Sequence, residues 1–344
     1  MGFDKDFVFS AVSDDVDGIN LPPAIAARWP AYAKWYTSGV DNRERPTTEV
    51  CRAQLATHMP ELIPSYDHLI NRLAPHLNDA HLLPQLLSLY NSPAFVAGCS
   101  QAAWLRPQGN ALVRNYDFPL KLWDAMLLHS NWNGTRVIAM TDCLWGVLDG
   151  INEHGLTASL SFGGKLQVGD GFAVTLALRY ILEFCRTVAE ACAVLQRIPV
   201  SMAYNIVLMD AQGDHRTVFI GPDQAAEITH VPTTTNHQPN SGLETALEIL
   251  SDSRVRDRFL QSRVNDQHQS LEHLKQLFLS PPLYRSNKDA KGWGTIYTSC
   301  YQPALGSVTL LWPNQQMEQS FAHFQDMQIQ VTPTERRVNV EDQV

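Results

Sequence analysis

The sequence predicts an α+β fold in which strands and helices occur in separate groups. Residues 1–92 carry apolar side chains mainly at helical spacing. After Pro93 the pattern changes to short runs rich in Val, Phe, Trp, Leu and Ile, and two helical pairs interrupt these runs. Grouped strands and grouped helices are typical of layered α+β folds, whereas a regular strand–helix alternation would predict a parallel sheet.

The first part of the chain is expected to be helical. In the stretch after Pro60, Leu62, Tyr66, Leu69 and Leu73 recur at intervals of three and four, which places them on one helix face. Turns with Pro and Asn separate this stretch from its neighbours. The predicted helices span 22–38, 47–58, 60–74 and 78–90.

The second part is expected to build sheets. The predicted strands are 94–105, 111–118, 125–132, 136–150, 153–164, 226–238, 295–301 and 306–312, with a hairpin over 203–221. The predicted helices here are 173–198, 243–262 and 268–279.

The composition is typical of a globular protein and argues against nucleic-acid and membrane partners. The chain has 344 residues, of which 44% are hydrophobic and 18% charged, as in ordinary globular proteins. Its net charge is −9 and Lys and Arg form no long runs, which argues against a nucleic-acid partner. No apolar run approaches the roughly 18 residues of a membrane span, and no secretory signal is evident at the start. We therefore expect a cytoplasmic protein without a membrane partner.

The cysteines do not form a metal-binding or disulfide pattern. They are scattered, no two form a CxxC pair, and no HExxH or EF-hand motif is present. The sequence thus predicts no metal, no bound cofactor and a reducing compartment. The cysteines are Cys51, Cys99, Cys143, Cys185, Cys192 and Cys300.

Cys99 follows Gly98 between two strand-like runs and is the candidate nucleophile. A thiol nucleophile needs a base, and no local signature of a Cys–His protease surrounds it. Cleavage before Cys99 would give the same residue an α-amino group with a pKa of about 8, which can take the thiol proton at neutral pH. Because Gly98 has no Cβ, its carbonyl is open to attack by that thiol. The pair predicts self-cleavage.

The motifs that follow resemble those of the N-terminal-nucleophile (Ntn) hydrolases. The similar branch holds choloylglycine (bile salt) hydrolase, penicillin V acylase and the acyl-CoA:6-aminopenicillanic acid acyltransferases. The matching stretches lie in the family's order over about 93–312. The first is Cys99, and the second is VRNYDF, which contains Arg114 and Asp117. The others are DGINEHGL at 149–156, Thr235-Asn236-His237, Ser253-Arg254 and Tyr297-Thr298-Ser299.

This resemblance implies a fold and a domain organisation. The fold would be a four-layer αββα sandwich of the Ntn-hydrolase type, with two antiparallel sheets face to face and helices outside. The helical N-terminal segment is similar to the removable leader of the acyltransferase members. Cleavage at Gly98–Cys99 would divide the chain into a helical fragment, 1–98, and a catalytic fragment, 99–344, that stay associated.

The resemblance also implies residue roles. Cys99 would be the nucleophile and, once freed, its own base. Asp117 would bind the α-amino group, and Arg114 would lie beside the thiol. Asn236 would hold the amine or the oxyanion, and Arg254 would support the site electrostatically.

One position departs from the family pattern. Where bile salt hydrolases carry Asn, this chain has Ser161, whose hydroxyl is shorter than an amide and points differently. Ser161 is therefore a candidate oxyanion donor, with a backbone N–H as the alternative. Tyr116 and Phe162 are candidates for lining an acyl pocket, although aromatic residues are more often part of a core.

The predicted activity is acyl transfer through a Cys99 thioester. The substrate would be a small-molecule acyl-amide or an acyl-CoA, and acyl-CoA would act as a co-substrate. Two alternatives stay open: a thiol hydrolase with His237 or His154 as base and no cleavage, and an unprocessed binding protein of the same fold. The sequence leaves the oligomeric state open, a homo-oligomer included.

Overall fold

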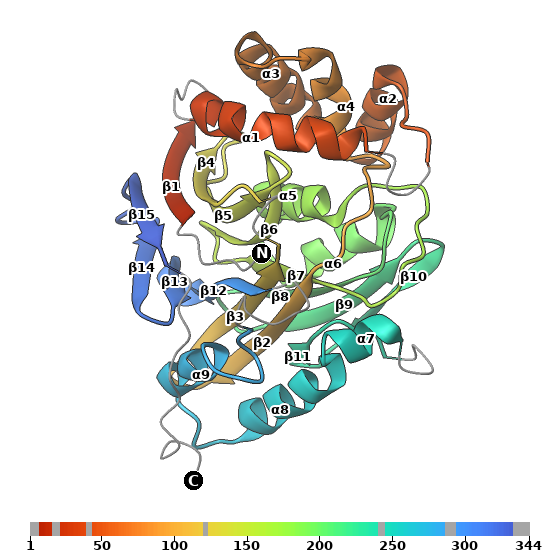
Figure 1. The fold of residues 1–344 in the computed structure, drawn as a ribbon. Helices are drawn as coiled ribbons and strands as arrows, with labels where there is room; N and C mark the ends of the chain where they lie inside the picture. The colour runs from red at the N-terminus through yellow and green to blue at the C-terminus, as the bar shows by residue number, and fades with distance from the viewer. Residues whose placement is uncertain are drawn as a thin grey trace.

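A computed structural model describes residues 7–15, 21–38, 43–119, 123–239, 245–285 and 294–332. Within these ranges the chain forms a nine-stranded sheet and a six-stranded sheet (Figure 1). The larger sheet has the order β10 (Gln224–Thr229), β9 (His215–Gly221), β8 (Tyr204–Met209), β7 (Thr157–Phe162), β6 (Gly146–Asn152), β5 (Val137–Asp142), β4 (Met126–Asn131), β1 (Phe7–Asp15), β15 (Met327–Val331). The smaller sheet has the order β11 (Thr233–Thr234), β2 (Gly98–Arg106), β3 (Gly109–Phe118), β12 (Gly294–Gln302), β13 (Ser307–Trp312), β14 (Gln315–Ser320).

The two sheets pack between two helical layers. Helices α5 (Val174–Phe184) and α6 (Val188–Arg197) cover the larger sheet. On the other side, β2 and β3 contact β7, and α8 (Ser253–Asn265) and α9 (Leu271–Phe278) cover the smaller sheet. A short helix, α7 (Ala246–Leu250), leads into α8. This arrangement is the predicted αββα sandwich.

The N-terminal helices agree with the sequence prediction. They are α1 (Leu21–Tyr36), α2 (Thr48–His58), α3 (Ile63–Leu73) and α4 (Leu83–Ser88), and they gather at one end of the molecule, opposite α8 (Figure 1). Short 3₁₀ helices lie at Pro60–Leu62, Ala74–His76, Ala80–Leu82 and Pro303–Leu305.

The N-terminal segment also contributes a strand that the sequence analysis did not predict. β1 lies inside the larger sheet, antiparallel to β15 and parallel to β4. Its alternating pattern buries Phe9 and Ala11 while Val8 is exposed. The expectation of two purely antiparallel sheets is corrected by this parallel pair, and the N-terminal segment is joined to the sandwich by backbone hydrogen bonds.

Three predicted elements prove to be divided. The strand expected over 226–238 becomes β10 in the larger sheet and β11 in the smaller one. The helix expected over 243–262 is interrupted at Asp252, which has a left-handed backbone (φ 49°). The strand expected over 136–150 becomes β5 and β6, separated by a turn at 143–145. Helices α5 and α6 form the helical pair expected over 173–198, and Thr187 caps the first turn of α6. Strands β14 and β15 were not predicted.

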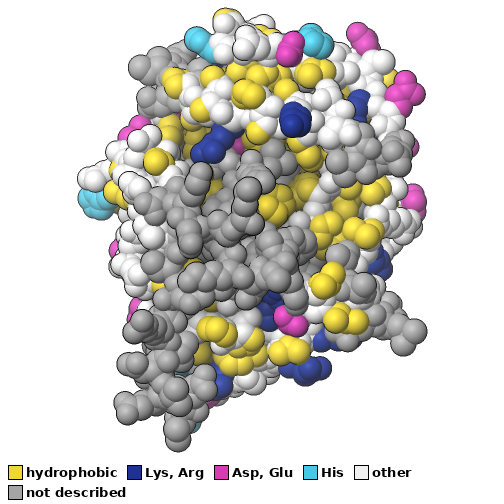
Figure 2. Space-filling model, viewed as in Figure 1, with side chains coloured by type: hydrophobic (Ala, Val, Ile, Leu, Met, Phe, Trp, Pro, Cys, Tyr) yellow, Lys and Arg dark blue, Asp and Glu magenta, His cyan; other side chains and the backbone are white. Residues whose placement is uncertain are grey.

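One continuous hydrophobic core joins the N-terminal helices, the larger sheet and the space between the sheets. A second core lies under α8 and α9 and includes Trp104, Leu260 and Phe278. On the face shown in Figure 2, the described Lys and Arg side chains lie scattered among apolar and acidic ones. In the described part of the chain, no helix combines the length and apolarity that a membrane crossing requires.

Candidate functional site

Cys99 is the second residue of β2 and its side chain lies between the two sheets. Its register partner on β3 is Tyr116, and its side chain is fully buried. Arg114, two residues before Tyr116, lies on the same strand face and donates from Nη2 to Cys99 Sγ over 3.4 Å. The predicted contact between Arg114 and the thiol is therefore present.

The guanidinium of Arg114 is held from several sides. Its Nε donates to the carbonyl of Leu160 over 2.9 Å, and its Nη1 donates to Tyr297 Oη over 2.8 Å. The same Nη1 forms a fully buried ion pair with Asp149. Tyr301 also donates to Asp149, over 2.6 Å. These bonds fix the orientation of the cation toward the sulfur atom.

Asn236 spans the peptide bond that is predicted to be cleaved. Its Oδ1 accepts a hydrogen bond from the backbone N–H of Cys99 over 3.0 Å. Its Nδ2 lies 3.2 Å from the carbonyl oxygen of Ala97 and 3.2 Å from that of Phe162. Asn236 therefore contacts the backbone on both sides of Gly98.

Arg256 is a site residue that the sequence analysis missed. Its Nη1 donates to the carbonyl of Cys99 over 2.6 Å and to Ser100 Oγ over 2.7 Å. Its Nη2 donates to Asn236 Oδ1 over 2.7 Å. The side chain is fully buried, so these contacts form away from solvent.

Arg254 was predicted to support the site electrostatically, and that role remains a prediction; the arginine of α8 that contacts Cys99 is Arg256. Arg254 pairs with Glu248, and its side chain is 34% exposed. The buried positions of α8 recur at Ser253, Arg256, Leu260 and Val264, and residues two apart on a helix point in nearly opposite directions. This spacing in the sequence was the signal that could have identified Arg256.

Asp117 lies on the opposite face of β3 from Arg114, as the spacing of three residues predicted. Its register partner is Gly98. Thr295 donates to Asp117 Oδ1 over 2.7 Å, whereas Oδ2 has no hydrogen-bond partner among the described residues. This Oδ2 atom lies 3.9 Å from Nη1 of Arg256 and 3.8 Å from Nε of Arg285.

Burial controls the ionisation of the cluster. It raises the pKa of the Cys99 thiol, and the adjacent Arg114 acts against that rise. Burial also raises the pKa of Asp117, against the pull of Arg256 and Arg285. The same effect lowers the pKa of Arg256 to about 10. The thiol therefore needs a base to become a thiolate at neutral pH.

The remaining predicted residues surround this cluster. Ser161 donates to the carbonyl of Thr235 over 2.7 Å and lies 3.3 Å from Nδ2 of Asn205. Its hydroxyl thus ties β7 to the segment that carries Asn236, and its role as an oxyanion donor remains a prediction. Phe162 is buried and its carbonyl binds Asn236. Tyr116 is buried, and its ring lies 4.8 Å from the guanidinium carbon of Arg114.

The two histidines considered as alternative bases have other contacts. Nδ1 of His237 lies 2.8 Å from Ser253 Oγ, and Nε2 lies 3.7 Å from Asp257 Oδ2. Burial lowers the pKa of His237. His154 lies in the turn between β6 and β7, next to Asn152. These positions favour a base other than histidine for Cys99.

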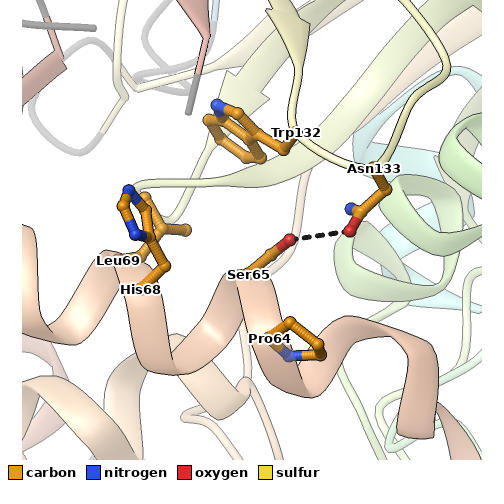
Figure 3. Close-up of a pocket in the computed structure, with 6 residues that line it drawn as sticks. All are labelled: Pro64, Ser65, His68, Leu69, Trp132 and Asn133. Carbon is orange, nitrogen blue, oxygen red and sulfur yellow. Dashed lines mark hydrogen bonds between the residues drawn. The ribbon is translucent and has the colours of Figure 1, made fainter. Parts of the chain in front are cut away.

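A small cavity of about 220 Å³ lies away from the cluster, between α3 and the turn from β4 to β5 (Figure 3). Ser65 and Asn133 are joined across it by a hydrogen bond of 2.9 Å. The lining residues are Pro64, Ser65, His68, Leu69, Trp132 and Asn133. None of them is a predicted site residue. Within the described ranges, no three His, Cys, Asp or Glu side chains group as metal ligands would.

Comparison with protein families gives one match. The sequence model of acyl-coenzyme A:6-aminopenicillanic acid acyl-transferase matches residues 104–317. The matched range begins after Cys99 and includes Arg114, Asp117, Asn236 and Arg256. A comparison with curated proteins gave no match.

The solved structures similar to this one include the following three. Two are variants of the conjugated bile acid hydrolase of Clostridium perfringens, at 13% and 12% identity and TM-scores of 0.45 and 0.47. Each comparison covers 70% of this chain and 99% or 100% of the other. The third is penicillin V acylase of Agrobacterium tumefaciens, at 16% identity and a TM-score of 0.41, covering 69% of this chain and 87% of that one.

Proposed function

Since the chain belongs to the acyl-coenzyme A:6-aminopenicillanic acid acyl-transferase family, we propose that it is a self-processing cysteine amidohydrolase or acyltransferase. Its nucleophile would be Cys99, freed as an N-terminal residue by cleavage after Gly98. The family consists of acyl-transferring enzymes, so the alternative of a non-enzymatic binding protein is set aside.

The observation that carries the proposal is the set of contacts around the Gly98–Cys99 bond. The N–H of Cys99 is bound by Asn236, its carbonyl is bound by Arg256, and its thiol is bound by Arg114. Opposite Gly98, Asp117 has a buried oxygen without a hydrogen bond from any described residue. Arg256 and Arg285 lie 3.9 and 3.8 Å from this oxygen, beyond hydrogen-bond distance, and a new α-amino group on Cys99 would supply the missing hydrogen-bond donor.

Self-cleavage would proceed in two steps. The sulfur of Cys99 attacks the carbonyl carbon of Gly98, the thiol proton passes to the nitrogen of Cys99, and the C–N bond breaks. The product is a thioester between Gly98 and the thiol, beside a free α-amino group. Water then hydrolyses the thioester, which leaves the carboxylate of Gly98 and the thiol of Cys99.

Turnover would use the same groups on a substrate. The α-amino group of Cys99 accepts the thiol proton, and the thiolate attacks an amide or thioester carbonyl. The leaving amine or thiol takes that proton, and the acyl group remains on the sulfur. Water or an amine acceptor then removes the acyl group. Arg114 would stabilise the thiolate, and Asp117 would hold the α-amino group in place.

The substrate would be a small-molecule acyl-amide or an acyl-CoA, in keeping with the family. The N-terminal fragment would remain as a subunit, because β1 lies between β4 and β15 inside the larger sheet and its helices share the main core. All six cysteines are free and buried, which supports a reducing compartment such as the cytoplasm.

Intact-mass measurement of the purified protein tests the proposal. We expect two polypeptides divided after Gly98, and a single full-length species from Cys99→Ala. His237→Gln serves as the matched test of the alternative base and should still be cleaved. A chain that stays whole yet hydrolyses acyl-amides only while His237 is present would replace the proposal with a Cys–His mechanism.

A further inference from the structure

A buried group of acids joins the N-terminal segment to the strand that faces Cys99. Tyr32, on α1, places its hydroxyl 2.7 Å from Asp124 Oδ1 and 2.5 Å from Asp142 Oδ1. The other oxygen of Asp142 accepts a hydrogen bond from Tyr116 over 3.1 Å. Tyr116 is the register partner of Cys99. The chain of contacts therefore runs from α1 to the predicted nucleophile.

The geometry favours one shared proton in this group. The hydroxyl of Tyr32 has one hydrogen, yet two carboxyl oxygens lie within hydrogen-bond distance of it. A full hydrogen bond in both contacts needs a second hydrogen, carried by one of the two carboxyl groups. The backbone N–H of Cys143 lies 3.1 Å from Tyr32 Oη and 2.9 Å from Asp142 Oδ1, so it donates to this group without joining Asp124 to Tyr32. One proton held between Asp124 and Asp142 would complete both contacts.

The environment agrees with a shared proton. Burial raises the pKa of both carboxyl groups, and Asp124 raises that of Asp142 further. Arg28, also on α1, acts to lower the pKa of Asp124, which leaves Asp142 as the group that keeps the proton. Cys143 is buried beside the pair.

The acid pair of Asp124 and Asp142 is also connected, through Asp124, to a cavity outside the Cys99 cluster. Asp124 lines a cavity of about 730 Å³ together with residues of α1, β1 and β15, Arg28 among them, and with Asp326, which directly precedes β15. A proton can thus exchange at Asp124 without passing through the Cys99 cluster.

We infer that Tyr32 is a positioning residue for Cys99: by sharing one proton with Asp124 and Asp142, it orients Tyr116, which pairs with Cys99 across the strands and whose ring lies against Arg114. This inference rests on the proposed function, because it assigns the N-terminal segment a part in the chemistry of Cys99 during self-cleavage. If both carboxyl groups ionise, one hydroxyl cannot serve two carboxylates, and Asp142 moves away from the position that orients Tyr116.

The first test compares two tyrosines on the same helix. The hydroxyl of Tyr36, one turn after Tyr32, is buried and has no hydrogen-bond partner in the described part of the chain. We expect Tyr32→Phe to slow self-cleavage of the newly translated chain about tenfold, as for the loss of one coupled contact, and Tyr36→Phe to leave the rate unchanged. Equal rates for the two variants would overturn the inference.

The second test separates positioning from a general loss of stability. If Tyr32 acts through Tyr116, the loss caused by Tyr32→Phe disappears in a Tyr116→Phe background. An additive loss would show that Tyr32 acts through the fold alone. This double-mutant cycle does not depend on knowing the substrate, because its readout is the cleavage rate.

A third variant, Asp124→Asn, tests the proton shared by Asp124 and Asp142. It should also fold, because its side chain can keep the local hydrogen bonds. In Asp124→Asn, the amide can accept from the N–H of Leu144, which donates to Asp124 in the native chain over 3.2 Å, and can donate to Tyr32. The hydrogen bonds are then complete at every pH. We expect the ratio of the cleavage rate of this variant to that of the native chain to rise as pH rises above neutral. A ratio that stays constant with pH would overturn the shared proton.

One spectroscopic readout distinguishes this inference from the proposed function. The native protein should show the infrared band of a protonated carboxyl group, and Asp142→Asn should remove it. Absence of the band in a chain that cleaves normally overturns the inference and leaves the proposed function standing. A native chain that neither cleaves nor hydrolyses acyl-amides overturns both.

Discussion

Arg256 donates a hydrogen bond to Asn236 over 2.7 Å, and these two side chains together bind the backbone of Cys99 on both sides of its Cα. One arrives from α8 and the other from the end of β11, so two segments far from Cys99 in the sequence fix its backbone. Both contacts are buried, where charge-assisted hydrogen bonds are strong and their loss is costly.

Arg256→Ala should prevent self-cleavage, because the carbonyl of Cys99 and the amide of Asn236 lose their shared donor. In a Cys99→Ala background, where the chain stays whole, we expect urea unfolding to show a loss of about 3 kcal/mol from the broken buried hydrogen bonds. The matched control is Arg258→Ala, which truncates an exposed arginine of the same helix and should cost about 0.5 kcal/mol or less. Similar losses for the two arginines would contradict the assignment of Arg256.

Asp117→Asn should impair the cleaved enzyme more than it destabilises the whole chain. The hydrogen bond from Thr295 can remain, and Oδ2 loses only its long ion-pair contacts with Arg256 and Arg285, at 3.9 and 3.8 Å. After cleavage the variant lacks the carboxylate that would hold the α-amino group, so turnover of an acyl-amide should fall about 100-fold. Thermal melting in the Cys99→Ala background and steady-state turnover measure the two effects. Full turnover by the variant would remove Asp117 from the mechanism.

Arg114→Gln should shift the pH dependence of self-cleavage to higher pH. Burial already raises the pKa of the Cys99 thiol, and Arg114 is the cation that acts against it. Without that cation the thiolate forms only at higher pH, so the rate falls at neutral pH and recovers as pH rises. Arg114→Lys keeps the charge and should shift the profile less. Identical profiles for the native chain and Arg114→Gln would show that Arg114 does not stabilise the thiolate.

Asp142→Asn should flatten the dependence of stability on pH below neutrality. Burial and the neighbouring Asp124 raise the pKa of Asp142 from 3.8 to about 7. Between these values the folded chain holds a proton that the unfolded chain has released, so folding stability decreases as pH rises through this window. Asp142→Asn should remove that decrease in thermal melting. Asp67→Asn, which breaks the surface pair with Arg52, is the control and should keep the native slope.

The local elements of the fold were predictable because their signals are local. The helices of the N-terminal segment follow from apolar spacing within each segment, and most strands follow from short apolar runs between turns. β1 was missed because nothing within nine residues reveals partners at β4 and β15, which lie more than 100 and 300 positions away. The strand over 226–238 was predicted as one because local pattern does not show which sheet a strand joins.

The candidate site was likewise predictable only in part from the sequence. Cys99, Arg114, Asp117 and Asn236 were predicted from motif order, and the structure brings them together around one peptide bond; their catalytic roles remain predictions. Arg254 was predicted because it stands in the Ser-Arg motif, with Arg258 one turn later as its rival, whereas the arginine buried on α8 is Arg256. Tyr32 gave no signal, because its partners lie about 90 and 110 residues away.

By itself the sequence determined the layered α+β class, the cysteine preceded by glycine, and the order of charged residues after it, because these depend on composition, period and spacing. Only the tertiary structure decided which arginine binds the backbone of Cys99, that Asp117 has an oxygen without a hydrogen bond from any described residue, and that Tyr32 of the N-terminal segment reaches Tyr116 through Asp142. The physical reason is that burial, proton sharing and ion pairing depend on distances between segments that only folding brings together.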